Sequence, residues 1–214
     1  MSLDQILYYF SVYIPPLLFA ITLHEASHGY AARYFGDNTA YVLGRVSLNP
    51  INHIDLIGTV VLPGVLILMG SGFIFGWAKP VPVSIGNLRR PKQDMIYVAL
   101  AGPLANLVMA TLWAIVLKVW VSAEISSDVL IHMALFGIKI NIILMLFNLI
   151  PILPLDGGRI LEGLLPTRLS MSYAKIEPYG MMIVVALLVF GGINRFLVAG
   201  VNLMAQLLLG LVGL

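Results

Sequence analysis

The sequence predicts an all-α integral membrane protein, a bundle of about four to six membrane-spanning helices with a re-entrant or short membrane-associated β segment. The first observation is composition: 60% of the residues are hydrophobic and 10% are charged, whereas soluble domains carry about 25% charged residues. The second is a series of long apolar stretches, beginning with the uncharged stretch from Ile6 to Leu23. We expect residues 1–214 to form a single domain, because the sequence contains no internal repeat, low-complexity tract or hydrophilic appended segment.

Charge and cysteine content exclude several classes of protein. The net charge of +2 is too small to indicate binding to nucleic acid. The chain has no cysteine, so disulfides and cysteine-ligated metal sites are excluded. A metal site would therefore have to use histidine, aspartate or glutamate. The N-terminal residues carry no basic cluster, and we expect no cleavable signal peptide.

The first apolar stretch, Ile6 to Leu23, should span the membrane with a kink at Pro15 and Pro16. It leads into H-E-A-S-H at residues 24–28. On a helix His24 and His28 share a face and can hold one zinc ion. Glu25 can then reach a metal-bound water and act as a general base. The alternatives are a chance match on an ordinary helix, or histidines that lie at the aqueous end of the span.

The next region, from Gly36 to Phe75, is less regular. His53 is a third histidine close to the motif, either an extra metal ligand or gate, or a hydrogen-bonded loop residue. Residues 56–75 are apolar but interrupted by proline and glycine, so they could span or be re-entrant. Basic residues on both sides favour a re-entrant segment, because the positive-inside rule puts both groups in the cytoplasm. These residues are Arg33 and Arg45 before the segment, and Lys79, Arg89, Arg90 and Lys92 after it.

The stretch from Trp77 to Ile85 alternates prolines with β-branched residues. Proline has no N–H to donate, so this pattern predicts an edge strand or extended segment. An exposed edge at Val81 and Val83 could pair with an unwound substrate peptide. The alternative is a rigid proline-rich connector.

Two further spans are expected from Met95 to Trp120 and from Leu130 to Ile150. Asn106 lies within the first and should hydrogen-bond to a neighbouring helix. Lys139 lies in the middle of the second, where it must snorkel, pair or face water. After it, residues 179–214 are long enough for one span plus a second, with a turn at 191–195.

Between these regions lies N-L-I-P-I-L-P-L-D-G-G at residues 148–158. Pro151 and Pro154 should end the preceding helix. Asp156 is a carboxylate in an apolar stretch whose prolines and glycines interrupt regular helix. It could complete a set of two histidines and one carboxylate that leaves a metal position open for water. Alternatively, it caps the following helix.

Three of these stretches resemble the site-2 protease family of intramembrane zinc metalloproteases. They are H-E-A-S-H at 24–28, A-G-P-L-A-N-L at 101–107 and the proline-rich motif at 148–158. In addition, F-G-W-A-K-P-V-P-V at 75–83 is similar to the membrane-associated β region of the short, compact prokaryotic members. The resemblance covers about Leu17 to Gly163, and the order and spacing of the motifs make it specific.

The resemblance implies zinc ligands at His24, His28 and Asp156, with one ion per chain, and Glu25 as the catalytic base. It implies that Asn148 positions substrate or stabilises the reacting carbonyl, and that Asn106 has a supporting part. The expected reaction is hydrolysis of a peptide bond in or near a transmembrane segment of a substrate protein. The expected location is the plasma membrane of a prokaryote, with the active site open to the cytoplasm.

Two other functions remain open on the sequence alone. One is a membrane zinc transporter, in which the same three residues bind the ion transiently. The other is an inactive relative that only binds substrates. Both leave Glu25 without a chemical role. The expected partners are a transmembrane substrate protein and the lipid bilayer, with no nucleic acid, and the oligomeric state stays undetermined.

Overall fold

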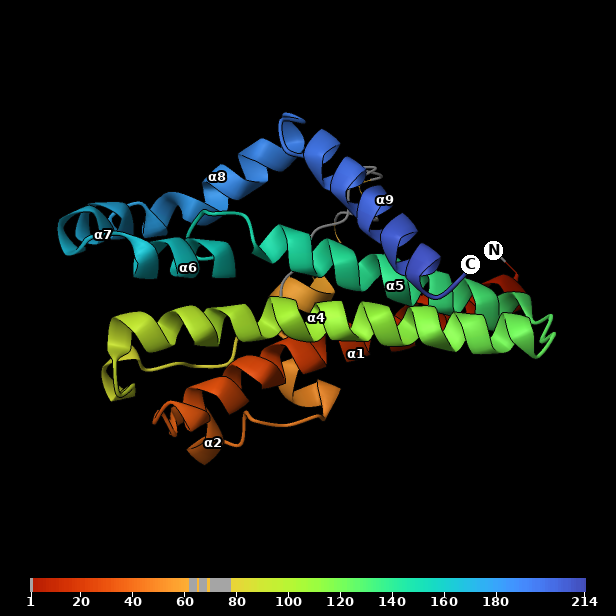
Figure 1. The fold of residues 1–214 in the computed structure, drawn as a ribbon, viewed down its shortest axis with the longest axis horizontal. Coiled ribbons are helices and arrows are strands. Elements are labelled where there is room, and N and C mark those ends of the chain that lie inside the picture. Colours follow the sequence, from red (N-terminus) through yellow and green to blue (C-terminus); the bar gives the residue numbers. More distant parts are fainter. Residues whose placement is uncertain (1, 62–64, 66–68, 70–77) are drawn as a thin grey trace.

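Three long helices form the centre of the fold: α1 (Leu3–Tyr34), α4 (Pro91–Ser122) and α5 (Asp128–Asn148). Each of them packs against the other two, as Figure 1 shows for α4 and α5 lying side by side. The structure is a computed structural model that describes residues 2–61, 65, 69 and 78–214. This central group confirms the prediction of a multi-span helical bundle.

Helix α1 is longer than the apolar stretch from which it was predicted. It starts at a capping box, in which the Ser2 hydroxyl accepts from the Gln5 backbone N–H and the Gln5 side chain accepts from Ser2 N–H. It continues through Pro15 and Pro16 and ends at Tyr34. The histidine motif therefore lies inside the helix and follows the apolar segment without a break.

Shorter elements complete the chain. The region after α1 contains α2 (Thr39–Val42), a 3₁₀ helix (Pro50–His53), a π-helix (Leu56–Val61) and a second 3₁₀ helix (Ile85–Asn87). The C-terminal region contains α6 (Asp156–Leu164), α7 (Thr167–Ala174), α8 (Glu177–Val189) and α9 (Asn194–Leu211). Helix α6 packs on α4 and α9 packs on α5, while α8 and α9 form an inverted V in Figure 1.

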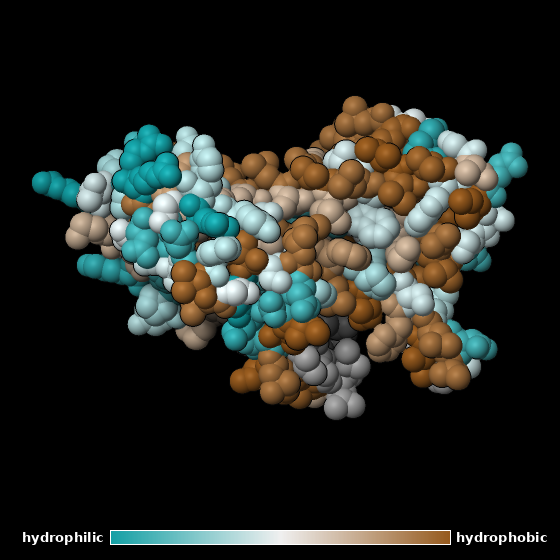
Figure 2. Space-filling view, turned by 90° about the horizontal axis from the view of Figure 1, so that it is seen from below, coloured by the Kyte–Doolittle hydropathy of each residue, from teal (hydrophilic) through white to brown (hydrophobic). Residues whose placement is uncertain are grey.

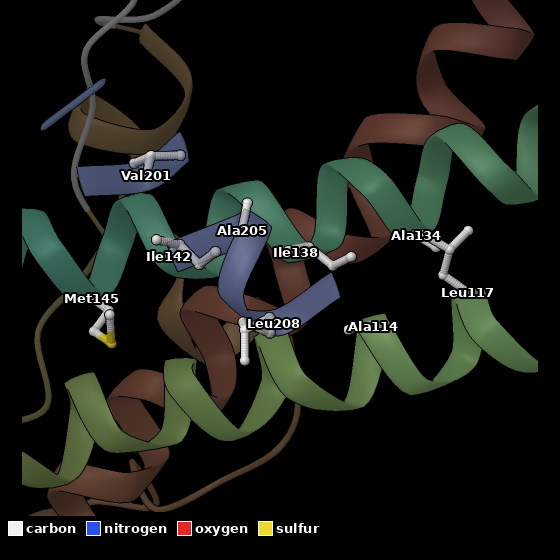
Figure 3. Close-up of a cluster of buried hydrophobic side chains, with 10 residues drawn as sticks. Ala114, Leu117, Ala134, Ile138, Ile142, Met145, Val201, Ala205 and Leu208 are labelled. Carbon is white, nitrogen blue, oxygen red and sulfur yellow. The ribbon is translucent and has the colours of Figure 1, made fainter. Parts of the chain in front are cut away.

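Among the described residues the largest buried cluster joins α4, α5 and α9, and four of its members are alanines. Small residues let helix backbones approach closely, which favours association inside a membrane. Figure 3 shows the cluster between the three helices. Its members are Ala110, Ala114, Leu117, Ala134, Ile138, Ile142, Met145, Val201, Ala205 and Leu208.

Within the described part of the chain, four helices are long and apolar enough to cross a membrane: α1, α4, α5 and α9. Helices α7 and α8 are bent by 67° relative to each other and add a fifth span if they count as one. Figure 2 shows broad areas of apolar side chains, in brown, on one face, with hydrophilic side chains concentrated toward one end. Exposed apolar side chains over such an area suit contact with lipid.

The predicted re-entrant or β segment is not supported. Residues 56–61 form a π-helix, and most of the stretch predicted to be re-entrant, 62–75, lies outside the described residues. Of the predicted edge strand at 77–85, residues 78–84 form no helix or strand. We call residues 78–84 the extended segment.

The extended segment is held by contacts other than a sheet ladder. The backbone N–H of Lys79 donates to the carbonyl oxygen of His53 at 2.9 Å. The guanidinium of Arg45 donates to the carbonyl oxygens of Lys79 and Pro80, at 2.8 and 3.3 Å. Because Pro80 and Pro82 have no N–H, alternate positions cannot donate to a neighbouring strand. Residues 78–84 are thus held by His53 and Arg45, and the predicted strand pairing is not supported.

Candidate metal centre

Two helices bring three ligand groups to one point. His24 and His28 lie one turn apart on α1, and Asp156 is the first residue of α6. The Nε2 atoms of the two histidines are 3.1 Å apart. The Nε2 atom of His24 is 3.3 Å from Asp156 Oδ2, and that of His28 is 3.4 Å from Asp156 Oδ1. Among the described residues, these three form the group of histidines and acids that could hold a metal ion, with ligand atoms within 4.8 Å of one another.

The other ring nitrogen of each histidine has a hydrogen-bond acceptor. His24 Nδ1 lies 2.6 Å from Asn106 Oδ1, and His28 Nδ1 lies 2.7 Å from the carbonyl oxygen of Val98. A carbonyl oxygen can only accept, so each Nδ1 must carry the proton. In a neutral imidazole each Nε2 then presents a lone pair toward the centre. A hydrogen bond from Nδ1 to an acceptor fixes the histidine tautomer in which Nε2 is free to bind a metal.

A cation fits the resulting arrangement. When both imidazoles are neutral, their two lone pairs and the Asp156 carboxylate converge, which is unfavourable unless a positive charge lies among them. Consistent with this, Asp156 Oδ2 is buried and has no hydrogen-bond partner among the described residues, although His24 Nε2 is nearby. Two histidines and one carboxylate with a position left open is a donor set used by catalytic zinc sites.

The position of Asp156 excludes the capping role considered for it. The residue that caps α6 is Leu155, and it makes no side-chain capping bond. Asp156 instead lies in the first turn, with its carboxylate toward the histidines. The glycines that follow allow this close packing. A Cβ at Gly157 would lie 2.2 Å from the carbonyl oxygen of Leu149, and one at Gly158 would lie 2.4 Å from the Leu153 nitrogen.

Gly102 allows α4 to approach the two imidazole rings. A Cβ at this position would lie 2.4 Å from His28 Nε2 and 2.6 Å from His24 Cε1. No side chain can occupy that space without displacing a ring. The glycine of the A-G-P-L-A-N-L stretch is therefore a packing requirement of the centre, and Asn106, one turn further along α4, reaches His24 from the same face.

Glu25 is tied to the extended segment. One carboxylate oxygen, Oε2, accepts from the backbone N–H of Val81 at 2.9 Å. The Val81 side chain is 7% exposed, and it packs close to Gly29, whose added Cβ would lie 3.3 Å from Val81 Cγ1. The extended segment therefore crosses α1 beside the histidine motif. Val83 packs against a separate small cluster that includes Ala32.

Asp37 anchors the C-terminal end of the extended segment. Its carboxylate is fully buried and accepts from Thr39 N and Oγ1, from Ser84 N and from Asn87 Nδ2. Burial alone would raise the pKa of Asp37, but these hydrogen bonds outweigh it and hold the pKa below its ordinary value. The carboxylate is consequently charged at neutral pH and keeps all four donors.

The remaining predicted residues lie in different settings. His53 is buried, its Nε2 donates to the carbonyl oxygen of Ser47 at 2.8 Å, and it does not belong to the group of three ligands. Asn148 is the last residue of α5, half-buried, with its Nδ2 donating to the Leu144 carbonyl oxygen at 3.0 Å. Lys139 is exposed on α5. Asn141, a buried residue of α5 that accepts from Asn106, was not predicted as a site residue; its signal in the sequence is a polar amide inside an apolar span.

Comparison with known proteins places this centre in a family. The model of peptidase family M50 matches residues 118–191, a stretch that contains Asn148 and Asp156. Over 196 residues the chain is 36% identical to "Putative zinc metalloprotease YwhC" of Bacillus subtilis (strain 168), covering 87% of this chain and 86% of that protein. The chain belongs to peptidase family M50. It is also 30% identical over 189 residues to "Putative zinc metalloprotease Rip2" of Mycolicibacterium smegmatis, covering 87% of this chain and 70% of that protein.

Membership of M50 confirms the resemblance to site-2 proteases and identifies the protein as a membrane metalloprotease. It decides against the transporter that the sequence alone left open. No solved structure matches the chain significantly, so the arrangement of the centre rests on the geometry described above.

Proposed function

We propose that this M50 protease is a zinc-dependent intramembrane endopeptidase that hydrolyses a peptide bond in or near a transmembrane segment of a substrate protein. The observation that carries the proposal is the convergence of His24, His28 and Asp156 within 4.8 Å. Glu25 lies on the same helix as the two histidines, and that helix is long and apolar enough to cross a membrane. This combination supports the proposal of a hydrolytic centre on a membrane-spanning helix.

The three ligands would hold one zinc ion, which when bound makes water acidic enough to ionise near neutral pH and polarises a substrate carbonyl. The carboxylate of Glu25 takes the proton from the attacking water and can return it to the leaving amine. Its hydrogen bond from Val81 N–H holds one oxygen and leaves the other to receive the proton. Asn148, at the end of α5, would position the substrate or stabilise its reacting carbonyl.

A membrane-spanning substrate must unwind before it is cut, because a helix hides its carbonyls in internal hydrogen bonds. We assign the binding of the unwound part to the extended segment, including Val81 and Val83, which lies beside Glu25. Pro80 and Pro82 restrict the backbone of this segment, so it loses little entropy when an extended peptide lies along it.

Crosslinking tests this role of the extended segment. A photoreactive residue at Pro82, which is half-buried, should crosslink to a substrate held on the inactive Glu25→Gln background. The matched position Val119, 57% exposed on α4, should not. Equal crosslinking at both positions, or none at Pro82, would make the segment a structural connector.

We further propose that the enzyme lies in the plasma membrane of a prokaryote with its active site open to the cytoplasm. Basic residues cluster after both parts of the centre, which the positive-inside rule puts in the cytoplasm. They are Arg33 and Arg45 after the histidines, and Arg159, Arg168 and Lys175 after Asp156.

Single cysteines test the topology, because the chain has none of its own. Cysteines at the exposed positions Asn38 and Thr167 should be protected from a membrane-impermeant thiol reagent in intact cells. A cysteine at exposed Ser126, between α4 and α5, should be labelled. The reverse pattern would place the active site on the outer face.

The proposed activity is tested by cleavage of single-span test proteins by the purified enzyme in detergent. Cleavage should stop when a zinc chelator is added and return when zinc is restored. The membrane-spanning test protein should be cut in or near its span, and a soluble version without the span should be cut more slowly. Chelator-resistant cleavage would contradict zinc dependence, and cleavage confined to soluble regions would contradict an intramembrane reaction.

A further inference from the structure

A directional chain of hydrogen bonds runs from α5 through α4 to the metal ligand His24. On α5, Asn141 Nδ2 donates to the carbonyl oxygen of Gly137 at 2.8 Å. On α4, Asn106 Nδ2 donates to Asn141 Oδ1 at 3.0 Å and to the Ala20 carbonyl oxygen at 3.2 Å. Asn106 Oδ1 then accepts from His24 Nδ1 at 2.6 Å. Both asparagines are fully buried, so water cannot replace these partners.

The direction of every bond in this chain follows from two backbone carbonyls. The Gly137 oxygen can only accept, so the amide nitrogen of Asn141 must face it and its oxygen must face Asn106. That oxygen and the Ala20 oxygen are both acceptors, so the amide nitrogen of Asn106 must face them. The oxygen of Asn106 is left for His24, whose Nδ1 must therefore carry the proton.

We propose that Asn141 is a positioning residue for the metal centre: it orients the Asn106 amide and thereby keeps His24 in the tautomer with Nε2 free to bind zinc. This inference rests on the proposed zinc ligation by His24. It adds Asn141, which lies behind Asn106, to the residues that support the metal centre. His28 has no such chain, because its Nδ1 donates directly to the backbone at Val98.

Removal of Asn141 should act through the amide of Asn106. In Asn141→Leu, Asn106 Nδ2 keeps only the longer bond to Ala20, so one acceptor instead of two opposes a turn of the amide nitrogen toward His24. When the amide is turned, His24 carries its proton on Nε2, which then cannot bind a metal. We expect zinc affinity to fall about tenfold, since loss of outer partners of metal-binding histidines typically costs about 10- to 100-fold.

The conservative variant separates orientation from packing. A protonated aspartate at this buried position has a carbonyl oxygen that accepts from Asn106 and an O–H that donates to Gly137. Asn141→Asp should therefore keep zinc affinity within about threefold of wild type. As a control, Thr111→Val removes a hydroxyl on α4 that donates to the Leu107 carbonyl oxygen of its own helix and should leave zinc affinity unchanged.

Zinc affinity is measured by competition with a chelator, and the His24 tautomer is measured by NMR of metal-free protein labelled with ¹⁵N-histidine. Wild type should show His24 with the proton on Nδ1, and Asn141→Leu should shift it toward Nε2. If Asn141 acts through Asn106, the double variant with Asn106→Ala should bind zinc no more weakly than Asn106→Ala alone. Additive losses, or an unchanged tautomer in Asn141→Leu, would overturn the inference.

The tautomer measurement also keeps the inference separate from the proposed function. If wild type bound no zinc, the proposed ligation would fail, whatever the asparagines do. If wild type bound zinc but metal-free His24 carried its proton on Nε2, the positioning role would fail alone. Should Asn141→Leu not fold, Asn141→Ala removes the amide without placing a larger apolar group there, and the same tautomer shift is expected.

Discussion

Glu25→Gln should abolish proteolysis while leaving the zinc content unchanged. The amide keeps the shape of the side chain and one oxygen to accept from Val81 N–H, but it cannot take a proton from water. Loss of a general base typically costs about 10²- to 10⁴-fold in rate, and we expect the upper part of that range because the one carboxylate in the group of three, Asp156, is assigned to the metal. Cleavage of a single-span substrate and metal analysis of the same preparation measure the two quantities.

The matched control is Glu124→Gln, the same chemical change in the loop between α4 and α5, which should leave the rate unchanged. Cleavage by Glu25→Gln at near the wild-type rate would remove this residue from the mechanism. Loss of zinc together with activity would instead make Glu25 a support of the metal centre.

Alanine at His24, His28 or Asp156 should remove bound zinc and activity together. These three side chains supply every ligand atom of the group, so each substitution leaves two. The loss of zinc affinity should exceed the about 10- to 100-fold that follows removal of an outer partner. Metal content after dialysis against a weak chelator, followed by a cleavage assay, checks both effects.

Two further histidines provide matched controls for this substitution. His53→Ala removes a buried imidazole that bonds to Ser47, and His132→Ala removes one that contacts Tyr8. Neither belongs to the group of three, so both variants should keep wild-type zinc content. Full retention of zinc by the alanine variants at all three proposed ligands would refute the ligand assignment. Loss of zinc in His53→Ala would show that His53 contributes to zinc binding.

The helices could be predicted from the local sequence, because a long apolar stretch inside a membrane has few other backbone conformations available. Every backbone polar group must be satisfied within the segment, so these stretches form helices. This is why the spans near 95–120 and 130–150 agree with α4 and α5 to within a few residues. The strand pairing predicted for 77–85 is not supported, because pairing of a strand depends on a distant partner and residues 78–84 bond instead to Glu25, Arg45 and Asp37.

The sequence by itself determined the membrane class, the family resemblance and the pair His24 and His28, because helical spacing alone puts those two side chains on one face. Only the tertiary structure decided the rest of the centre. Asp156 joins the histidines because α6 packs on α4, and the proton position on His24 depends on amides from two other helices. Contacts between residues so far apart in the chain depend on how the helices pack. They cannot be predicted from the local spacing or composition of the sequence.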